Sequence, residues 1–382
     1  MQAKTTSPQA GSLATWLVAI LGVGLLVILL LSFVLERQAR PSSQVAGVSA
    51  SLRIAYFEFG RDADILWLAN PSDLTDRKRL FGVQHAPEFG VVPSVAPDGR
   101  SFVYTALAPN TPAPSPNAPA GLWHAPVSAN AVPRLIAPTV DLLVEPVWSA
   151  DSRNLVYRRS TANGYVLAII PVAGGEERVL TTSETSALFP VGFDSSGATT
   201  MYYVAIDESS GSRLFETDLT TGVSKFVAAL SLGLTRDWSL SPDGTKVAYL
   251  EIGIGPDVVS SRALVFDFAG AKAEAVTDRT TSAFSPVWSA DGDLVIGSLD
   301  ETNRTAGLLT VDTTSRTVLE GPARGFEVPL AVGPAGSSYI VRAFENASSY
   351  SPGRSSLALV GADGARQTIA TGEVTFVGWT NP

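Results

Sequence analysis

Acidic residues recur along the chain just before each copy of a short apolar pattern, and their type and spacing could support chemistry. They are Glu88, Asp141, Glu145, Glu184, Asp237, Asp278, Glu327 and Glu373, with Phe326 directly before the seventh. Carboxylates that converge on apolar support can bind a cation, an amine-bearing ligand or a basic segment of a partner. The alternative is a set of solvated loop acids, because the chain has 36 Asp and Glu residues and the cationic Arg236, Arg279 and Arg324 share these loops.

The motifs of common catalytic and metal centres are missing from the sequence. There is no Cys, no GxSxG nucleophile elbow, no P-loop, no GxGxxG and no HExxH. The two histidines, His85 and His124, have no carboxylate at a spacing that suggests metal ligation, and Asp291-Gly292-Asp293 lacks the further ligands of a calcium loop. We therefore predict a protein without enzymatic activity, metal or cofactor. An enzyme that uses a few facing carboxylates of perturbed pKa stays an alternative.

The overall charge argues against one class of partner. The formal net charge is -9 and the sequence pI is about 4.9. Binding to the phosphates of nucleic acid requires clustered Lys and Arg. We expect no nucleic-acid partner.

An internal repeat indicates the elements that must position the acids. The hexapeptide PVWSAD occurs at 146–151 and again at 286–291. Aligning the chain on its Trp finds related copies at intervals of about 44 to 53 residues, a period typical of propellers and solenoids. The aligned positions, which we expect to pack between neighbouring units, are Val95, Trp148, Phe193, Leu240, Trp288, Val332 and Trp379.

Each copy has the same order of local signals. A short apolar run ends in a turn such as Asp98-Gly99, where Asp bonds its own backbone and Gly accepts a positive φ. An alternating strand and a second hairpin follow, which makes four strands per copy. Residues 51–81 supply three strands without the first, and the last residues of the chain, TFVGWTNP, are such a first strand. We therefore predict an all-β, seven-bladed β-propeller closed by both termini and preceded by a single transmembrane α-helix.

The repeated pattern resembles the PxWSPDGxxIAF pattern of the TolB-like, WD-repeat-related propellers. The resemblance covers essentially residues 51–382, although Ser152, Ser196 and Ala335 replace the usual turn residues. It implies an extracytoplasmic position and a role in a cell-envelope or membrane-protein assembly. The related propellers also include those that gate prolyl-oligopeptidase-type peptidases, and we find no counterpart of their hydrolase domain in this sequence.

The N-terminal region predicts a membrane anchor. Residues 16–35 contain Ser32 as their only polar side chain, and as a helix they would span about 30 Å, the thickness of a bilayer core. A cleaved signal peptide is the alternative, but its apolar region would be shorter. We divide the chain into a polar tail (1–15), an anchor helix (16–36), a linker (37–50) and the propeller (51–382). More cationic side chains follow the predicted helix than precede it, which favours a cytoplasmic propeller. Long domains, however, cross the membrane largely regardless of their charge. On the family resemblance we predict a periplasmic or cell-surface propeller.

The function that we predict is that of a non-catalytic, membrane-tethered interaction or scaffold module. Its partners would be the lipid bilayer, through Trp16–Leu35, and other membrane or envelope proteins of one assembly. The rival hypothesis is a ligand-binding or sensory propeller, which predicts a pocket lined by Glu145, Asp237, Phe326 and Glu327. An interaction module predicts instead a broad apolar patch on an outer face.

Overall fold

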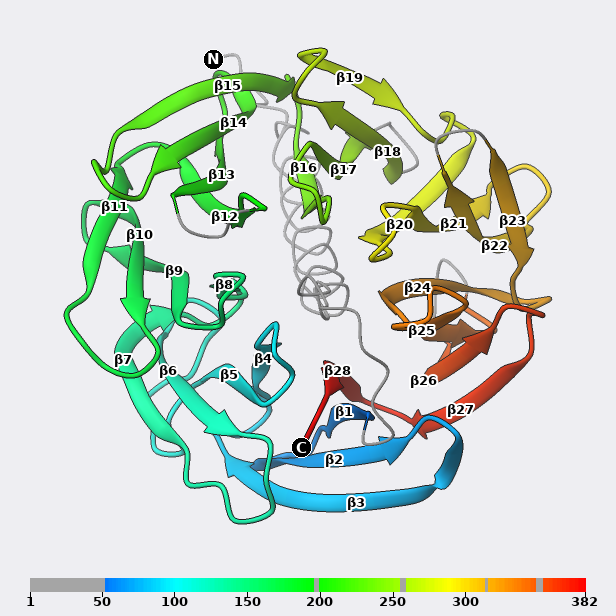
Figure 1. Cartoon of the computed structure of the whole chain (residues 1–382), viewed down its shortest axis with the longest axis horizontal. Helices are drawn as coiled ribbons and strands as arrows, with labels where there is room; N and C mark the ends of the chain where they lie inside the picture. The colour runs from blue at the N-terminus through cyan, green and yellow to red at the C-terminus, as the bar shows by residue number, and fades with distance from the viewer. Residues whose placement is uncertain (1–51, 196–198, 255–258, 313–314, 348–352) are drawn as a thin grey trace, which may run out of the picture. The chain divides into compact units, whose positions relative to one another are not determined.

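A computed structural model describes residues 52–195, 199–254, 259–312, 315–347 and 353–382. These residues form 28 strands in seven four-stranded antiparallel sheets, arranged as the blades of a ring (Figure 1). The prediction of an all-β, seven-bladed propeller is confirmed. The predicted tail, anchor helix and linker (1–50) lie outside the described residues. Within the described ranges, no helix is long and apolar enough to cross a membrane.

The blades are numbered along the chain, and their strands are given from the channel outward. Blade 1 is β28 (Val374–Thr380), β1 (Arg53–Glu58), β2 (Ala63–Asn70) and β3 (Asp73–Gln84); blade 2 is β4 (Val92–Val95), β5 (Ser101–Ala106), β6 (Pro119–Pro126) and β7 (Arg134–Asp141); blade 3 is β8 (Val147–Trp148), β9 (Asn154–Thr161), β10 (Gly164–Pro171) and β11 (Arg178–Ser183). Blade 4 is β12 (Ala187–Phe193), β13 (Thr200–Asp207), β14 (Gly211–Asp218) and β15 (Ser224–Ser231); blade 5 is β16 (Thr235–Leu240), β17 (Lys246–Ile254), β18 (Val259–Asp267) and β19 (Lys272–Ala275). Blade 6 is β20 (Thr281–Trp288), β21 (Leu294–Asp300), β22 (Ala306–Val311) and β23 (Arg316–Glu320); blade 7 is β24 (Gly325–Val332), β25 (Ser338–Glu345), β26 (Arg354–Gly361) and β27 (Arg366–Thr371).

Blade 1 closes the ring with strands from both ends of the described chain. The C-terminal strand β28 lies innermost and pairs antiparallel with β1, with Trp379 opposite Ile54 (Figure 1). A register shift between Ala55 and Tyr56 marks a β-bulge in this pair. The closure by both termini, predicted from the incomplete first repeat, is confirmed.

The turns between the first two strands of each blade explain the Asp-Gly dipeptides. Gly99 has a φ of 68° and Gly244 a φ of 72°. Glycine adopts this left-handed region without a steric cost because it has no Cβ. Asp98 accepts a hydrogen bond from the backbone nitrogen of Arg100 at 2.9 Å, which fixes the turn. Ser152, at the glycine position of blade 3, adopts a φ of 60°, and its hydroxyl accepts a hydrogen bond from the Asp98 nitrogen. The turns of neighbouring blades therefore contact one another.

The hydrophobic core lies between the blades. Trp148 of blade 3 belongs to an apolar cluster with Val103 and Val140 of blade 2. Trp288 of blade 6 belongs to a cluster with Ala248 and Leu250 of blade 5. Each blade is a thin sheet that buries its faces only against its neighbours, so ring closure completes the core.

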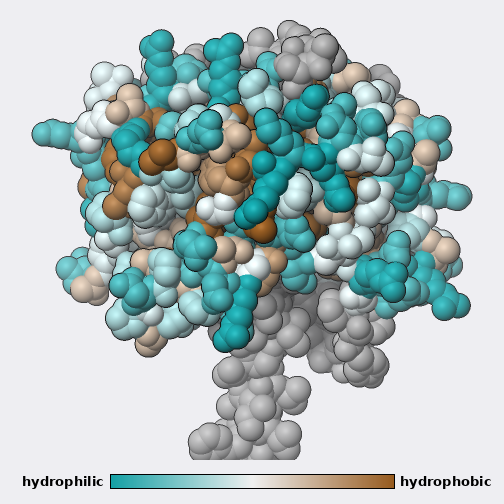
Figure 2. All heavy atoms as spheres, turned by 90° about the horizontal axis from the view of Figure 1, so that it is seen from below, coloured by the Kyte–Doolittle hydropathy of each residue, from teal (hydrophilic) through white to brown (hydrophobic). Residues whose placement is uncertain are grey.

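The outermost strands differ in how they meet solvent. In β3 the consecutive cations Arg77, Lys78 and Arg79 are exposed, and Figure 2, a view from this side, shows hydrophilic side chains among apolar ones. Charges on an edge strand discourage pairing with another chain. In β15, of sequence SKFVAALS, Lys225 is the one charged residue and Phe226 is exposed. The charges on the edge of blade 4 therefore protect it less against pairing with another chain than those on the edge of blade 1 do.

Candidate functional site

The predicted acids gather at one end of the ring, which we call the connection face. Here the outermost strand of each blade leads into the innermost strand of the next, and the second and third strands are joined by hairpins. The connections carry Glu88, Glu145, Glu184, Asp278 and Glu373, and Asp141 ends β7. Asp237 and Glu327 lie instead within the inner strands β16 and β24.

Half of these acids form ion pairs with arginine, and of the four partners only Arg236 was among the loop cations noted in the sequence. The pairs are Asp141 with Arg158, Asp237 with Arg236 at 3.6 Å, Glu327 with Arg366 at 2.6 Å, and Glu373 with Arg342 at 3.3 Å. Burial lowers the pKa of the Arg342 guanidinium, while the nearby Glu373 carboxylate opposes that shift. These four acids therefore do not form a ring of carboxylates without cationic partners.

The remaining predicted residues have separate surroundings. Asp278 is exposed and accepts hydrogen bonds from the hydroxyl and nitrogen of Thr280, which lower its pKa. Glu88 and Glu184 are exposed. Phe326 is half-buried between Phe284 and Phe344, in a stack with centroid separations of 4.6 and 4.9 Å. Phe344 is its cross-strand neighbour in blade 7 and Phe284 belongs to blade 6, so its contacts are those of core packing within and between blades.

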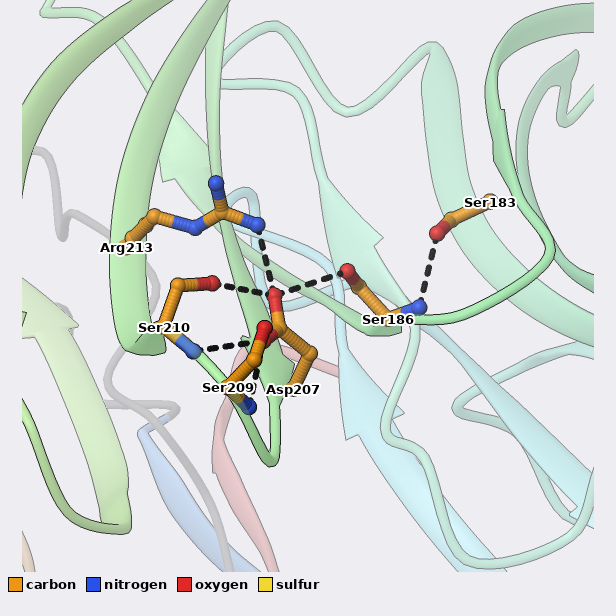
Figure 3. Close-up of polar contacts among 6 residues, drawn as sticks. All are labelled: Ser183, Ser186, Asp207, Ser209, Ser210 and Arg213. Atoms are coloured by element: carbon orange, nitrogen blue, oxygen red, sulfur yellow. Dashed lines mark hydrogen bonds and ion pairs between the residues drawn. The ribbon is translucent and has the colours of Figure 1, made fainter.

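A recurrent cluster on the connection face joins an acid, a serine and an arginine. In blade 4 the carboxylate of Asp207, at the end of β13, accepts hydrogen bonds from Arg213 at 2.7 Å and from Ser186 at 3.3 Å (Figure 3). The backbone nitrogens of Ser209 and Ser210 also donate to it, at 2.9 and 2.7 Å. The hydroxyls of Ser210 and Ser209, together with these nitrogens, lower the pKa of Asp207 well below its ordinary range.

The same cluster recurs in the next two blades. In blade 5 Glu251 binds Ser231 at 2.8 Å and Arg262 at 2.6 Å. In blade 6 Glu301 binds Ser282 and Arg304, both at 2.7 Å. The signal that could have shown it is an acid in or just after the second strand, followed 3 to 11 positions later by an Arg in the hairpin or in the third strand. In these three blades the carboxylates have a structural role, because each joins a serine near the preceding connection to the adjacent hairpin.

A cavity of about 170 Å³ lies in the channel, nearer the Asp-Gly turns. Its apolar lining includes Trp148, Phe193, Leu240 and Trp288, which are repeat positions. Of the four residues predicted to line a ligand pocket, Glu145 lines this cavity, whereas Asp237, Phe326 and Glu327 are not among its lining residues. The described lining holds two carboxylates, those of Glu145 and Asp194, and no Lys, Arg or His. This composition suits a neutral or cationic ligand better than an anionic one.

The two histidines are engaged in the fold. His85 is buried, and its two ring nitrogens lie 3.0 Å from Asp64 Oδ1 and 2.8 Å from the carbonyl of Ala86. His124 packs edge-on against Trp148, and burial together with Arg134 lowers its pKa. Neither ring is placed as an exposed general base. Among the described residues no three His, Cys, Asp or Glu side chains are grouped so as to hold a metal ion.

No protein-family model matches the chain, and no curated relative matches it either. Solved structures with this architecture do match. TolB from Acinetobacter baumannii is similar over 91% of this chain and 92% of its own, with a TM-score of 0.50 and 16% identity. The fold is that of TolB and related propellers.

Structures of enzymes also match, with higher TM-scores and lower sequence identities. Oligogalacturonate lyase from Vibrio parahaemolyticus matches over 85% of this chain and 87% of its own, with a TM-score of 0.58 and 12% identity. A prolyl endopeptidase structure matches 97% of this chain but 56% of its own, with a TM-score of 0.58 and 10% identity. At such identities the likeness establishes the fold alone, because one fold hosts many activities.

Proposed function

We propose that this TolB-like propeller is a non-catalytic, membrane-tethered interaction module, an accessory subunit of a cell-envelope or membrane-protein assembly. The observation that carries the proposal is an apolar strip on blade 4, formed by four exposed residues in β15 and in the segments that precede and follow it. They are Val223, Phe226, Leu232 and Leu234. An exposed apolar surface of this kind is what an interaction module needs for a partner.

The degree of exposure makes the strip unusual for surface residues. The exposed fraction is 58% for Phe226 and 92% for Leu232. The strip belongs to an edge strand with free backbone positions and a single charged residue. Burying these side chains against a partner would therefore stabilise a complex by the hydrophobic effect, at about 25 cal/mol for each Å² of apolar surface.

The membrane tether rests on the sequence of residues 16–35. Their continuous apolar character and length fit a bilayer, and the short linker that follows keeps the propeller near the membrane. The extracytoplasmic position rests on the TolB resemblance. Carbonate extraction of native membranes and protease accessibility in sealed spheroplasts test these two points separately.

The interaction is tested by mild-detergent extraction of the tagged full chain, followed by mass spectrometry of the proteins that co-migrate. We expect stoichiometric membrane or envelope proteins with the native chain and their loss in the variant Phe226→Asp/Leu232→Asp. The matched control is Val318→Asp on β23, where the exposed fraction is 62%. Retention of all partners by the strip variant, or a lone monomer for the native chain, would overturn the proposal.

A ligand-binding propeller is the second candidate, and the channel cavity favours it. The ligand would be neutral or cationic, because Glu145 and Asp194 line the cavity and no described lining residue is cationic. A panel of amines and matched alcohols, followed by tryptophan fluorescence of the full chain, tests this candidate. Binding of the amines that disappears in Glu145→Gln would support it, whereas equal responses to amines and alcohols would count against it.

A further inference from the structure

The geometry around His85 favours two protons on one buried ring. Nε2 faces the carboxylate oxygen of Asp64 at 3.0 Å, and Nδ1 faces the carbonyl oxygen of Ala86 at 2.8 Å. The carbonyl is an acceptor, and Asp64, which also accepts from the backbone nitrogens of Gly60 and Val91, is an acceptor at both oxygens when it is a carboxylate. Against an ionised Asp64 both ring nitrogens donate, which is the imidazolium form. A neutral ring would place a nitrogen lone pair against an oxygen in a site that excludes water.

The carboxylate of Asp64 holds two further segments beside His85. Its Oδ1 accepts a hydrogen bond from the Gly60 nitrogen at 3.0 Å, and its Oδ2 accepts one from the Val91 nitrogen at 2.8 Å. Gly60 belongs to the β1–β2 hairpin, and Val91 ends the connection from blade 1 to blade 2. The approach is so close that a Cβ on Gly90 would lie 2.6 Å from the Phe59 ring. The Asp64–His85 pair therefore clamps the hairpin and the connection together.

The clamp lies at the blade that closes the ring. The nitrogen of Phe59 donates to the carbonyl of Glu373, which directly precedes the closing strand β28. The ring of Phe59 stacks on His85 with 6.0 Å between centroids. Through these contacts the clamp joins the hairpin, the β3–β4 connection and the β27–β28 connection.

The charged groups around the ring favour its cationic form. Asp64 on β2 bonds the ring directly, and Asp62 on the hairpin accepts the backbone hydrogen bond of His85 through its carbonyl at 3.1 Å. Glu88 on the β3–β4 connection and Arg61 on the hairpin are exposed, and the Glu373 carboxylate on the third segment pairs with Arg342. Burial lowers the pKa of His85, but the hydrogen bonds to Asp64 and Ala86 and the charges of Asp64 and Asp62 outweigh it and leave the pKa raised.

We propose that the Asp64–His85 pair is a proton-controlled clamp on the ring-closing blade. With both nitrogens protonated, the pair holds the β3–β4 connection on the β1–β2 hairpin. When His85 gives one proton to solvent, one of its two hydrogen bonds becomes a contact between two acceptors. The connection and the hairpin then separate locally, while the backbone pairing of β28 with β1 keeps the ring closed.

The protonation is tested by nitrogen NMR of the full chain in detergent micelles with 15N-labelled histidine. The chain has two His residues, so His124→Gln assigns both sets of signals. We expect His85 to show two protonated nitrogens at pH 6 and to titrate above about pH 6.5, the ordinary value for histidine. A His85 ring that is neutral at pH 6 would overturn the proposal.

The release is tested by hydrogen exchange of the same protein between pH 6 and 9, with rates corrected for intrinsic exchange. We expect the protection of the Gly60 and Val91 amides to fall at least about tenfold across the titration of His85. The internal control is the pair of amides of Ser209 and Ser210, which Asp207 holds with an arginine partner instead of a histidine. His85→Gln should remove the pH step. Unchanged protection of the Gly60 and Val91 amides in the native chain while His85 titrates would overturn the proposal, and this outcome does not depend on whether a variant folds. A pH step that survives in His85→Gln would also overturn it.

Discussion

The indole nitrogen of Trp148 in blade 3 donates a hydrogen bond to the backbone carbonyl of Ser94 in blade 2, with 3.1 Å between nitrogen and oxygen. Trp288 in blade 6 makes the corresponding bond to Ser239 in blade 5 at 2.9 Å. Both tryptophans belong to the repeated PVWSAD segment. The repeat thus links each blade that carries it to the blade before it, through burial of the ring and through one directed bond.

Replacing Trp148 by Phe should lower the free energy of unfolding by more than the same change at Trp379. The Trp379 nitrogen is buried and has no hydrogen-bond partner among the described residues, so both changes remove similar volume but only one removes a bond. We expect a difference of about 1 kcal/mol. Chemical denaturation of the two variants measures it, and equal losses would show that the bond to Ser94 contributes nothing.

Replacing Gly378 by Ala should destabilise the closure between blades 1 and 2. A Cβ at this position would lie 2.3 Å from Val95 Cγ1, and overpacking of this kind costs about 1 to 3 kcal/mol. Gly222→Ala is the matched control, because Gly222 also has a positive φ but a Cβ there would meet nothing within 4 Å. Thermal unfolding should show the larger loss for Gly378→Ala; a larger loss at Gly222 would mean that backbone strain, and not contact with Val95, dominates.

Removing the guanidinium of Arg366 should be costly because its partner is buried. The Glu327 side chain is fully buried and its two oxygens accept from Arg366 at 2.6 and 2.9 Å. Arg366→Ala leaves that carboxylate without its cation, which costs about 3 kcal/mol. Arg316→Ala, at an exposed position on β23, is the control and should change stability by less than about 0.5 kcal/mol. Denaturant titration compares the two, and similar values would indicate that Glu327 finds another partner.

The stability of the propeller should depend on pH through His85. Because the folded pKa of His85 is raised, its stabilisation is complete below about pH 6.5 and is lost as pH rises through the folded value. At pH 6 we expect His85→Gln to be less stable than the native chain by roughly 2 kcal/mol, the scale of a hydrogen bond to a charged group. The difference should shrink toward pH 9. Unfolding midpoints across this range measure it, and a gap that widens with pH would contradict the sign.

The candidate site was only partly accessible to sequence reasoning. Five of the seven connections do carry an acid, Asp237 and Glu327 lie instead in the strands that follow the other two, and Glu145 does line the channel cavity. Arg236 was noted as a cation beside Asp237, but the other three arginine partners were not predicted, since Asp141 and Arg158 are 17 positions apart, Glu327 and Arg366 are 39 apart, and Glu373 and Arg342 are 31 apart. Likewise Asp64 and His85, 21 positions apart, show no local motif.

The seven-bladed ring and its closure by both termini could be predicted from the sequence. They follow from signals that act within a few residues, namely strand alternation and turns such as Asp98-Gly99, together with a regular spacing typical of repeat folds and a first repeat that the last strand of the chain completes. Which polar side chains meet became clear from the three-dimensional structure, as for Asp207 with Arg213 and Ser186 or Asp64 with His85. Those contacts depend on strand register, twist and the packing of one segment on another, and small shifts in any of these exchange one partner for another.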